Sequence, residues 1–281
     1  MPKIVTDSVS DIPLEVVKSL DITIIPLNIH FGADTFRDGI DLDRDEFYSR
    51  LQTSSILPKT SSPSPGILAD TFDRVGEESD EIVAVFLSRK FSITYDVALQ
   101  GVELMKSKRR VVVLDSTLGA MGQGLLVIEA AKKALAGASI DELIENVART
   151  IPQIYVRASL SSLKYLAMGG RIGKAQALLA SALKINPILG IKDGEAFPIA
   201  KLRSRVKANE WLYNFISSFK NLRVVAIEYG TNQDEAKALL KLVVSIFPDI
   251  PTYVSQINPV IGTHTGPQSL IVSVFSEESQ E

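Results

Sequence analysis

The chain has 281 residues, of which 46% are hydrophobic and 22% charged, a balance that indicates a folded globular protein and excludes a disordered or fibrous one. It has no cysteine and only two histidines, His30 and His264, which excludes disulfides, cysteine nucleophiles and metal sites built from several histidines. Its formal net charge of −3 gives no reason to expect nucleic-acid binding.

In the first half of the chain, predicted strands alternate with predicted helices, which is the pattern of a mainly parallel sheet with helices on both faces. The predicted strands are Lys3–Thr6, Ile22–His30 with Pro26 interrupting it, Glu81–Leu87 and Val111–Leu114. The predicted helices open at Asp11-Ile12-Pro13, run from Asp43 to about Leu51, cover Ser92–Lys106 and Gly119–Ala136, and restart at the capping box Ser139–Glu142.

Polar and glycine-rich stretches separate these elements. Thr53–Gly66 holds six Ser or Thr residues besides Thr53 and three prolines, which predicts a loop of high hydroxyl density. The acidic run from Asp34 to Glu46 lacks calcium-loop spacing and predicts a solvated turn followed by a helix start. Gly119–Gly124 and Gly169–Lys174 resemble phosphate-binding loops, but neither has the required order of residues. We expect close helix packing at the first and no ATP site at the second.

The second half of the chain is patterned differently. Helices are predicted near Ser161–Met168 and over Ala175–Leu183, and Asp193-Gly194 predicts a hairpin between Pro187–Ile191 and Ala196–Leu202. The remaining predicted elements are a helix over Val206–Phe219, a strand over Arg223–Tyr229, a helix capped at Asn232, and strands over Thr252–Ile257 and Ser269–Phe275. The predicted fold class is therefore an α/β domain with a mainly parallel sheet over residues 1–155 and an α+β domain over residues 156–281. We expect a ligand cleft between them.

Charge is distributed unevenly along the chain. The segment from Arg157 to Lys207 holds ten basic and two acidic residues, so its net charge is +8 and that of the remainder is −11. A local positive field of this kind favours an anionic ligand or partner. The N-terminus shows no signal-peptide pattern, and no apolar run approaches the roughly 18 residues of a membrane span. With no cysteine in the chain, we expect a cytoplasmic protein without stable membrane insertion.

Three groups of polar residues follow predicted strands. Asp7-Ser8 and Asp115-Ser116 stand where parallel sheets place ligand-contacting groups, although turn and capping roles explain them too. Ser92 opens a predicted helix, with Thr94 two residues later, and a helix N-terminus favours a carboxylate or phosphate. Helix capping alone also explains Ser92. The hydroxyl-rich Thr60–Ser64 stretch raises the expectation that two loops converge on one anion.

His264 lies in the sequence Gly-Thr-His-Thr-Gly-Pro before the last predicted strand. We expect an exposed, titratable histidine that hydrogen-bonds an anion or assists phosphoryl transfer. Ser92, His264 and Asp115 could in principle form a hydrolase triad. No G-x-S-x-G elbow surrounds any serine, however, so the sequence gives little support to nucleophilic catalysis.

Eight motifs, taken together and in order, resemble the DegV family over essentially the whole chain. They are Thr6-Asp7-Ser8, Thr60-Ser61-x-Pro63-Ser64, Leu87-Ser88 with Phe91-Ser92-x-Thr94-Tyr95, Asp115-Ser116, Gly169-Gly170-Arg171-Ile172, Pro187-Ile188-Leu189, Arg203, and His264-x-Gly266-Pro267. The fold that this resemblance implies is a parallel α/β domain followed by an α+β domain, in agreement with the predicted elements.

The resemblance also implies a function, that of the fatty-acid-binding subunit of a bacterial fatty acid kinase. Such a protein encloses an acyl chain in an apolar tunnel between its domains, and a separate ATP-dependent kinase subunit phosphorylates the carboxylate to an acyl phosphate for phospholipid synthesis. It is a carrier without a catalytic residue, a metal or a cofactor besides the bound fatty acid. By motif, the carboxylate ligands would be Thr60, Ser61, Ser92, Thr94 and His264, and the residues facing the kinase or the phosphate would be Arg171 and Arg203.

Two positions depart from the family pattern. Ile93 stands where family members often have glycine between the serine and the threonine, and Gln268 stands where glycine usually follows Gly-Pro. We expect these changes to reshape the tunnel mouth while the hydroxyls and the imidazole stay in place. Two other classes of function remain open, a serine-dependent hydrolase or transferase and a protein that binds a phosphosugar or nucleotide.

Overall fold

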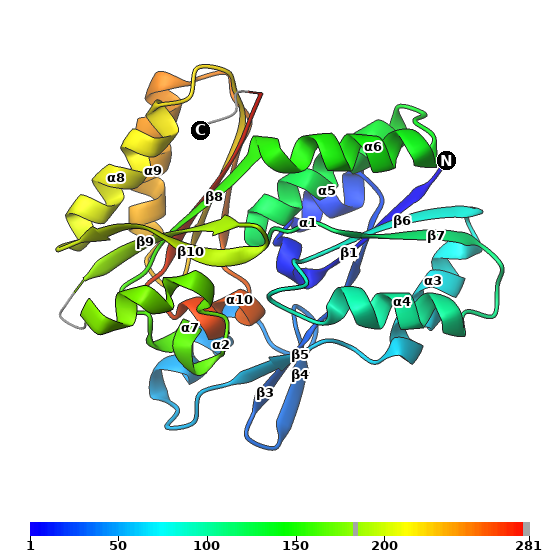
Figure 1. The fold of residues 1–281 in the computed structure, drawn as a ribbon, viewed down its shortest axis with the longest axis horizontal. Helices are drawn as coiled ribbons and strands as arrows, with labels where there is room; N and C mark the ends of the chain where they lie inside the picture. Colours follow the sequence, from blue (N-terminus) through cyan, green and yellow to red (C-terminus); the bar gives the residue numbers. More distant parts are fainter. Residues whose placement is uncertain (182–184, 278–281) are drawn as a thin grey trace.

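A four-stranded parallel sheet forms the centre of the N-terminal half (Figure 1). Its strand order is β2-β1-β6-β7, with β1 at Lys3–Asp7, β2 at Ile22–Ile25, β6 at Glu81–Phe86 and β7 at Arg110–Asp115. The structure is a computed structural model and describes residues 1–181 and 185–277. The α/β layout predicted for this half is confirmed.

Helices cover both faces of the parallel sheet. Helices α3 (Pro65–Gly76) and α4 (Thr94–Leu104) pack on one face, and α1 (Leu14–Ser19), α5 (Ala120–Leu135) and α6 (Ile140–Thr150) pack on the other. Successive side chains of a strand point to opposite faces. Val5 and Ala84 therefore join the core under α3 and α4, whereas Ile4 and Val85 join the core under α5 and α6.

A six-stranded mixed sheet forms the C-terminal half, with the strand order β10-β9-β8-β13-β11-β12. Its strands are β8 (Ile154–Ser159), β9 (Asn186–Lys192), β10 (Glu195–Leu202), β11 (Leu222–Tyr229), β12 (Thr252–Gln256) and β13 (Leu270–Ser276). Helices α8 (Arg205–Ser217) and α9 (Gln233–Ile246) lie side by side on one face (Figure 1). This half has the predicted α+β layout. The domain boundary near residue 155 stays a prediction.

Helix α5 connects the two sheets. It packs against β1 of the parallel sheet and against β8, β11 and β13 of the mixed sheet, and most of its side chains are buried. Its glycines permit this approach, because a Cβ at Gly122 would lie 2.3 Å from Val156 Cγ2, and one at Gly124 would lie 2.2 Å from the Ser10 carbonyl oxygen. The close helix packing predicted for Gly119–Gly124 is therefore confirmed, and the two halves share one core.

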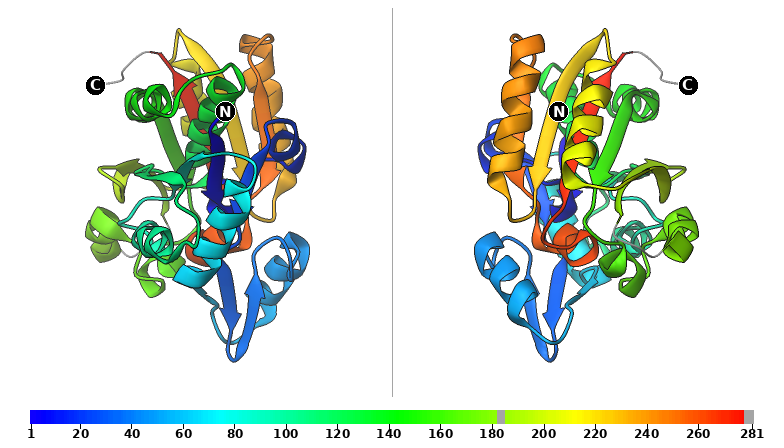
Figure 2. Two further views of the ribbon diagram at one scale, coloured as in Figure 1. Left: turned by 90° about the vertical axis from the view of Figure 1, so that its right-hand side faces the viewer. Right: turned by 90° about the vertical axis from the view of Figure 1, so that its left-hand side faces the viewer.

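A small three-stranded antiparallel sheet projects from one end of the molecule (Figure 2). Its strands β3 (Asn28–Phe31), β4 (Asp34–Arg37) and β5 (Lys59–Ser61) lie in the order β4-β3-β5. The single strand predicted over Ile22–His30 is wrong, because Pro26 lacks an N–H for the ladder and the chain passes there from the parallel sheet to the small one. The loop predicted over Thr53–Gly66 contains β5, which bonds to residues far away in the sequence.

The other helical segments are short. They are α2 (Arg44–Thr53), α7 (Lys164–Met168), α10 (Pro259–Thr265) and the 3₁₀ helices η1 (Ser8–Ser10), η2 (Ile151–Gln153) and η3 (Gly173–Ser181). The helix predicted over Ala175–Leu183 is a 3₁₀ helix as far as Ser181, and its last two positions lie outside the described residues. Among the described residues, no helix is both long and apolar enough to cross a membrane.

Local signals predicted several turns and helix ends correctly. Asp193 and Gly194 have φ angles of 52° and 79°, as the two central residues of the predicted hairpin turn require. Ser139 and Glu142 form the predicted capping box, and the Asn232 side chain caps α9.

Candidate functional site

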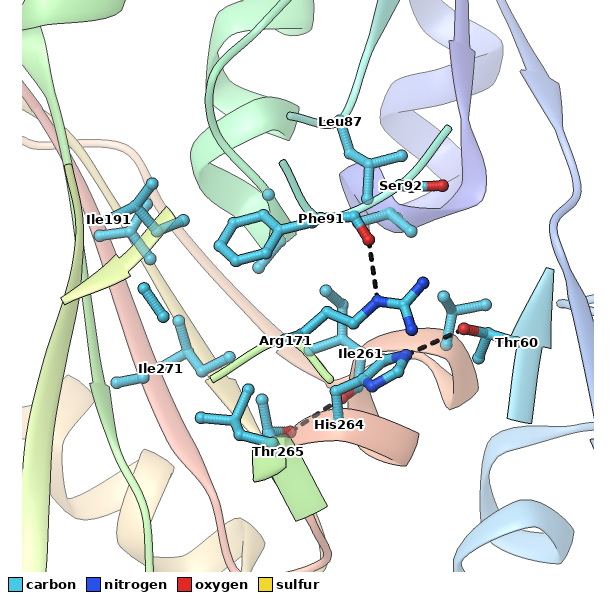
Figure 3. A pocket seen from close by; sticks show the side chains of 18 of the residues that line it. Thr60, Leu87, Phe91, Ser92, Arg171, Ile191, Ile261, His264, Thr265 and Ile271 are labelled. Atoms are coloured by element: carbon cyan, nitrogen blue, oxygen red, sulfur yellow. Dashed lines mark hydrogen bonds between the residues drawn. The ribbon is translucent and has the colours of Figure 1, made fainter. Parts of the chain in front are cut away.

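A cavity of about 310 Å³ lies between the two halves. Its walls are largely apolar. The N-terminal half contributes Val9, Leu27 and Leu87 to them, and the C-terminal half contributes, among others, Leu160, Leu189, Ile191 and Ile271 from β9, β13 and the segment after β8. Figure 3 shows that the apolar side chains of Ile191 and Ile271 lie on one side of the cavity, while Thr60, His264 and Arg171 gather on the other. The cavity is therefore apolar along its length and polar at one end.

The polar end is built around a contact between the two halves. Thr60 Oγ1 on β5 and His264 Nε2 on α10 are hydrogen-bonded at 2.9 Å (Figure 3). Helix α10 begins at Asn258, whose side chain accepts a hydrogen bond from the Ile261 backbone N–H, and Pro259 follows at the first helical position. This short helix carries His264 in its last turn and aims the ring at β5.

His264 is not the exposed loop histidine that the sequence predicts. Burial, and to a smaller extent the positive charge of Arg171, lower the pKa of its ring to about 4. The ring is packed so closely that a Cβ at Gly169 would lie 2.2 Å from its Nδ1 atom. Nδ1 is buried and has no hydrogen-bond partner in the described part of the chain. The neutral ring therefore turns Nε2 towards Thr60 at the polar end, and Nδ1 is closed off against Gly169.

Ser92 lines the cavity, as predicted for a carboxylate ligand, and its hydroxyl is held in place. Its Oγ atom lies 2.8 Å from Thr94 Oγ1 and accepts a hydrogen bond from the Thr94 backbone N–H at 3.3 Å. Thr94 itself is fully buried at the start of α4 and does not line the cavity. It is therefore placed to orient Ser92 rather than to touch a ligand. Ile93 lines the cavity and is 64% exposed, which fits a position at the mouth.

Ser61 lies beside Thr60 and also lines the cavity, but its hydroxyl has a different partner. Adjacent residues of a strand point to opposite faces, and Ser61 Oγ contacts His30 Nε2 at 2.8 Å, whereas Thr60 contacts His264. His30 Nδ1 in turn contacts Thr35 Oγ1 at 2.9 Å. Both histidines of the chain therefore hold this hydroxyl pair, one from each face of the small sheet. Nothing in the sequence pattern indicated this role for His30.

The two arginines predicted to face a phosphate or a partner are in different places. Arg171 lines the cavity and extends between Phe91 and His264 (Figure 3). Its Nε atom donates to the Phe91 carbonyl at 3.0 Å, and its Nη1 atom donates to the Gly169 carbonyl at 2.6 Å. Arg203 is exposed after β10 and does not line the cavity.

A hydrolase triad of Ser92, His264 and Asp115 is not assembled. Asp115 Oδ1 accepts from the Thr117 backbone N–H at 2.8 Å, and Ser92 contacts Thr94 rather than an imidazole. Asp7 is fully buried and accepts from the backbone N–H groups of Val9 and Leu87, so its role is structural. Ser116 caps its own turn through Leu118. For Asp7-Ser8 and Asp115-Ser116, the turn and capping interpretation is the one that fits the contacts.

Comparison with known proteins places these features in a family. Residues 1–277 match the family described as "Uncharacterised protein, DegV family". A DegV domain-containing protein of Caldanaerobacter subterraneus subsp. tengcongensis is 34% identical over 281 residues, which cover 98% of each chain.

Several solved structures are similar to this chain over almost its whole length. A stearic acid-binding protein from Eubacterium ventriosum superimposes with a TM-score of 0.91 at 28% identity, covering 99% of both chains. DegV, a fatty acid binding protein from Bacillus subtilis, gives a TM-score of 0.90 at 28% identity, covering 98% of this chain and 99% of the other. A fatty-acid-binding DegV family protein from Thermus thermophilus gives a TM-score of 0.88 at 27% identity, with the same two coverages.

Proposed function

The chain belongs to the DegV family, and we propose that it binds a long-chain fatty acid in the cavity between its halves and presents the carboxylate to a separate ATP-dependent kinase. The observation that carries this proposal is a cavity with apolar walls and hydroxyl, imidazole and guanidinium groups at one end. Three solved structures described as fatty-acid-binding, two of them DegV proteins, add support. The kinase reaction uses ATP, and we place it in the cytoplasm.

The apolar walls supply the affinity in this proposal. Each buried methylene group contributes about 0.8 kcal/mol, so a chain of roughly sixteen carbons gains about 10 kcal/mol before the cost of ordering it. Valine, leucine and isoleucine side chains from both halves surround the tail. A ligand seated there contacts both halves at once, so binding also stabilises the contact between them.

The polar end of the cavity provides the hydrogen bonds that a buried carboxylate needs. A buried carboxylate without hydrogen bonds is costly, and the hydroxyls of Thr60 and Ser92, which both line the cavity, are available to it. His264 acts through Thr60, because Nδ1 is closed off: Nε2–H of the neutral ring donates to the Thr60 hydroxyl, which in turn donates to the carboxylate. Ser61 contributes through the strand that holds Thr60, and Thr94 contributes by orienting Ser92.

The same arrangement suits presentation to a kinase. Neutral donors satisfy a carboxylate while withdrawing less charge from it than a directly paired arginine does, so it remains a nucleophile for the phosphate of ATP. Arg171, already fixed by two backbone carbonyls, then faces the incoming phosphate at the mouth. Arg203 is proposed to contact the kinase subunit. This chain provides binding and orientation, and the kinase subunit provides the catalysis.

Extraction of the purified recombinant protein with organic solvent, followed by mass spectrometry, tests the proposal. We expect a fatty acid in near-stoichiometric amount, because a ligand that buries a long acyl chain is retained through purification. An extract without fatty acid, together with no binding of added hexadecanoate in calorimetry, would falsify it. A phosphorylated metabolite in the extract would favour a phosphosugar or nucleotide site instead.

Replacement of Ser92 by alanine is expected to weaken binding of hexadecanoate by roughly 10- to 100-fold, because a hydrogen bond to a charged group contributes about 1.5–3 kcal/mol. Calorimetric titration measures the change. Ser64 is the matched control, since it caps α3 through Ile67 but does not line the cavity. Ser64→Ala should cost about 1 kcal/mol of stability, as a lost helix cap does, and leave affinity unchanged. Equal affinities of the two variants would show that Ser92 only holds Thr94 at the start of α4.

A further inference from the structure

Two acidic side chains, Asp11 and Glu228, meet at the seam between the halves, behind the cavity. Asp11 follows η1 in the N-terminal half, and Glu228 lies on β11 in the C-terminal half. Both are buried, with exposed fractions of 2% and 0%. Neither belongs to the proposed head-group site.

Each carboxyl group accepts a hydrogen bond from the backbone of the other half. The Asn258 backbone N–H donates to Asp11 Oδ2 at 3.0 Å, and the Met121 backbone N–H donates to Glu228 Oε2 at 3.1 Å. The two carboxyl groups are also close enough to interact with each other. The pair therefore joins the halves by reciprocal contacts that cross the seam in both directions.

A contact between two carboxyl groups requires a proton. After these backbone contacts, Glu228 Oε1 is buried without a hydrogen-bond donor among the described residues, and Asp11 Oδ1 faces only the guanidinium group of Arg44. One proton placed between them satisfies both oxygens. Without that proton, two negative charges would touch in a buried site, which is far more costly than sharing one.

Arg44 decides which carboxyl group keeps the proton. Its Nη2 atom lies 2.9 Å from Asp11 Oδ1, and its Nη1 atom donates to the Gln256 carbonyl. A cation beside Asp11 favours the ionised form of Asp11, whereas Glu228 has only the Met121 N–H group as a donor. We infer that Glu228 is protonated at neutral pH, donates to ionised Asp11 and so forms a proton-dependent latch between the two halves.

Other ionisable groups face the pair and agree with this assignment. Burial raises the pKa of Glu228 well above its usual range, and Asp11 raises it further. Asp38 was expected in a solvated turn but is buried, and burial raises its pKa to about 7, with Asp7 and Arg44 nearby. Tyr48 also faces the pair. In the described part of the chain, no three acidic or histidine side chains form a metal site, so protons and Arg44 neutralise this cluster.

The latch is continuous with the wall of the cavity. Val9 precedes Asp11 by two residues, Ala120 precedes Met121, and Ile271 is the cross-strand partner of Glu228. All three line the cavity. Loss of the shared proton therefore loosens the seam at the backbone that forms this wall.

Denaturant unfolding of Glu228→Gln and of the wild-type chain over pH 5–7 tests the latch. Glutamine keeps both contacts, since its amide donates to Asp11 and its carbonyl accepts from Met121. A group with a raised pKa in the folded state loses its stabilisation as pH rises. The unfolding constant of the wild type, relative to that of the variant, should therefore rise about tenfold per pH unit. The surface variant Glu103→Gln is the control and should show no such rise.

A second measurement does not depend on how the variant folds. Infrared spectra of the folded wild type at pH 7, with and without ¹³C-labelled glutamate, should contain one protonated-carboxyl band that shifts on labelling and is absent from Glu228→Gln. A pH-independent ratio of unfolding constants, or a wild type without that band, would overturn the assignment. Neither measurement requires a fatty acid, so the inference and the proposed function fail separately.

Discussion

Hexadecanoate is expected to bind several thousand-fold more tightly than decanoate. The two acids have the same carboxylate and differ by six methylene groups, each contributing about 0.8 kcal/mol when buried, or about 5 kcal/mol in total. Calorimetric titration below the micellar concentration measures both affinities. The heat-capacity change should become more negative with chain length, because that is the sign of apolar burial.

Two variants of one wall residue serve as a matched pair for this measurement. Ile191 lines the cavity from β9, on the side opposite His264 (Figure 3). Ile191→Asn places a polar amide against the tail and should weaken hexadecanoate binding more than decanoate binding, whereas Ile191→Val keeps an apolar wall. Affinities of the two acids within tenfold of each other would mean that the cavity does not enclose the tail.

The second large effect expected is a loss of about 3 kcal/mol of stability between pH 7 and pH 4 that depends on His264. The pKa of its ring is about 4 in the folded chain, against about 6.5 for an unperturbed histidine. Between these values the unfolded chain binds more protons than the folded chain. The stability that the neutral ring contributes is therefore present above pH 6.5 and is lost as pH falls towards 4.

Comparison of the wild type with His264→Gln isolates this effect. Asp7 and Asp38 have raised pKa values of about 6 and 7 and act in the opposite direction, since they stabilise the folded chain as pH falls. They are present in both proteins and cancel in the difference. His30→Gln, which removes the other imidazole from the small sheet, is the control. Parallel stability curves for the wild type and His264→Gln would contradict a buried, neutral ring.

Local signals in the sequence were sufficient for much of the fold. The Asp193-Gly194 turn and the Ser139–Glu142 capping box depend on residues close together in the chain, so their patterns predict them directly. The hydroxyls of Thr60 and Ser92 both line the cavity, and the sequence indicated this convergence because both stretches are rich in hydroxyl groups. These predictions required no knowledge of distant contacts.

Features that depend on distant contacts were missed. Strand β5 is three residues long and exists because it pairs with β3, about thirty positions earlier. Helix α10 has seven residues, too few for a helical periodicity to stand out, so His264 was expected in an exposed loop. The acidic run around Asp38 predicts a solvated side chain, but in the folded chain Asp38 is buried. In each case the deciding neighbour comes from another part of the fold.

The placement of α5 has a consequence for how the molecule gains and loses its structure. Neither sheet alone covers this helix, because β1 packs against one side of it and β8, β11 and β13 pack against another. A chain that ended after α6 would expose a large apolar surface of α5 to water. A chain that began at β8 would lack α5, the helix that covers one face of its mixed sheet. Assembly and melting of the two lobes should therefore be a single cooperative event rather than two independent ones.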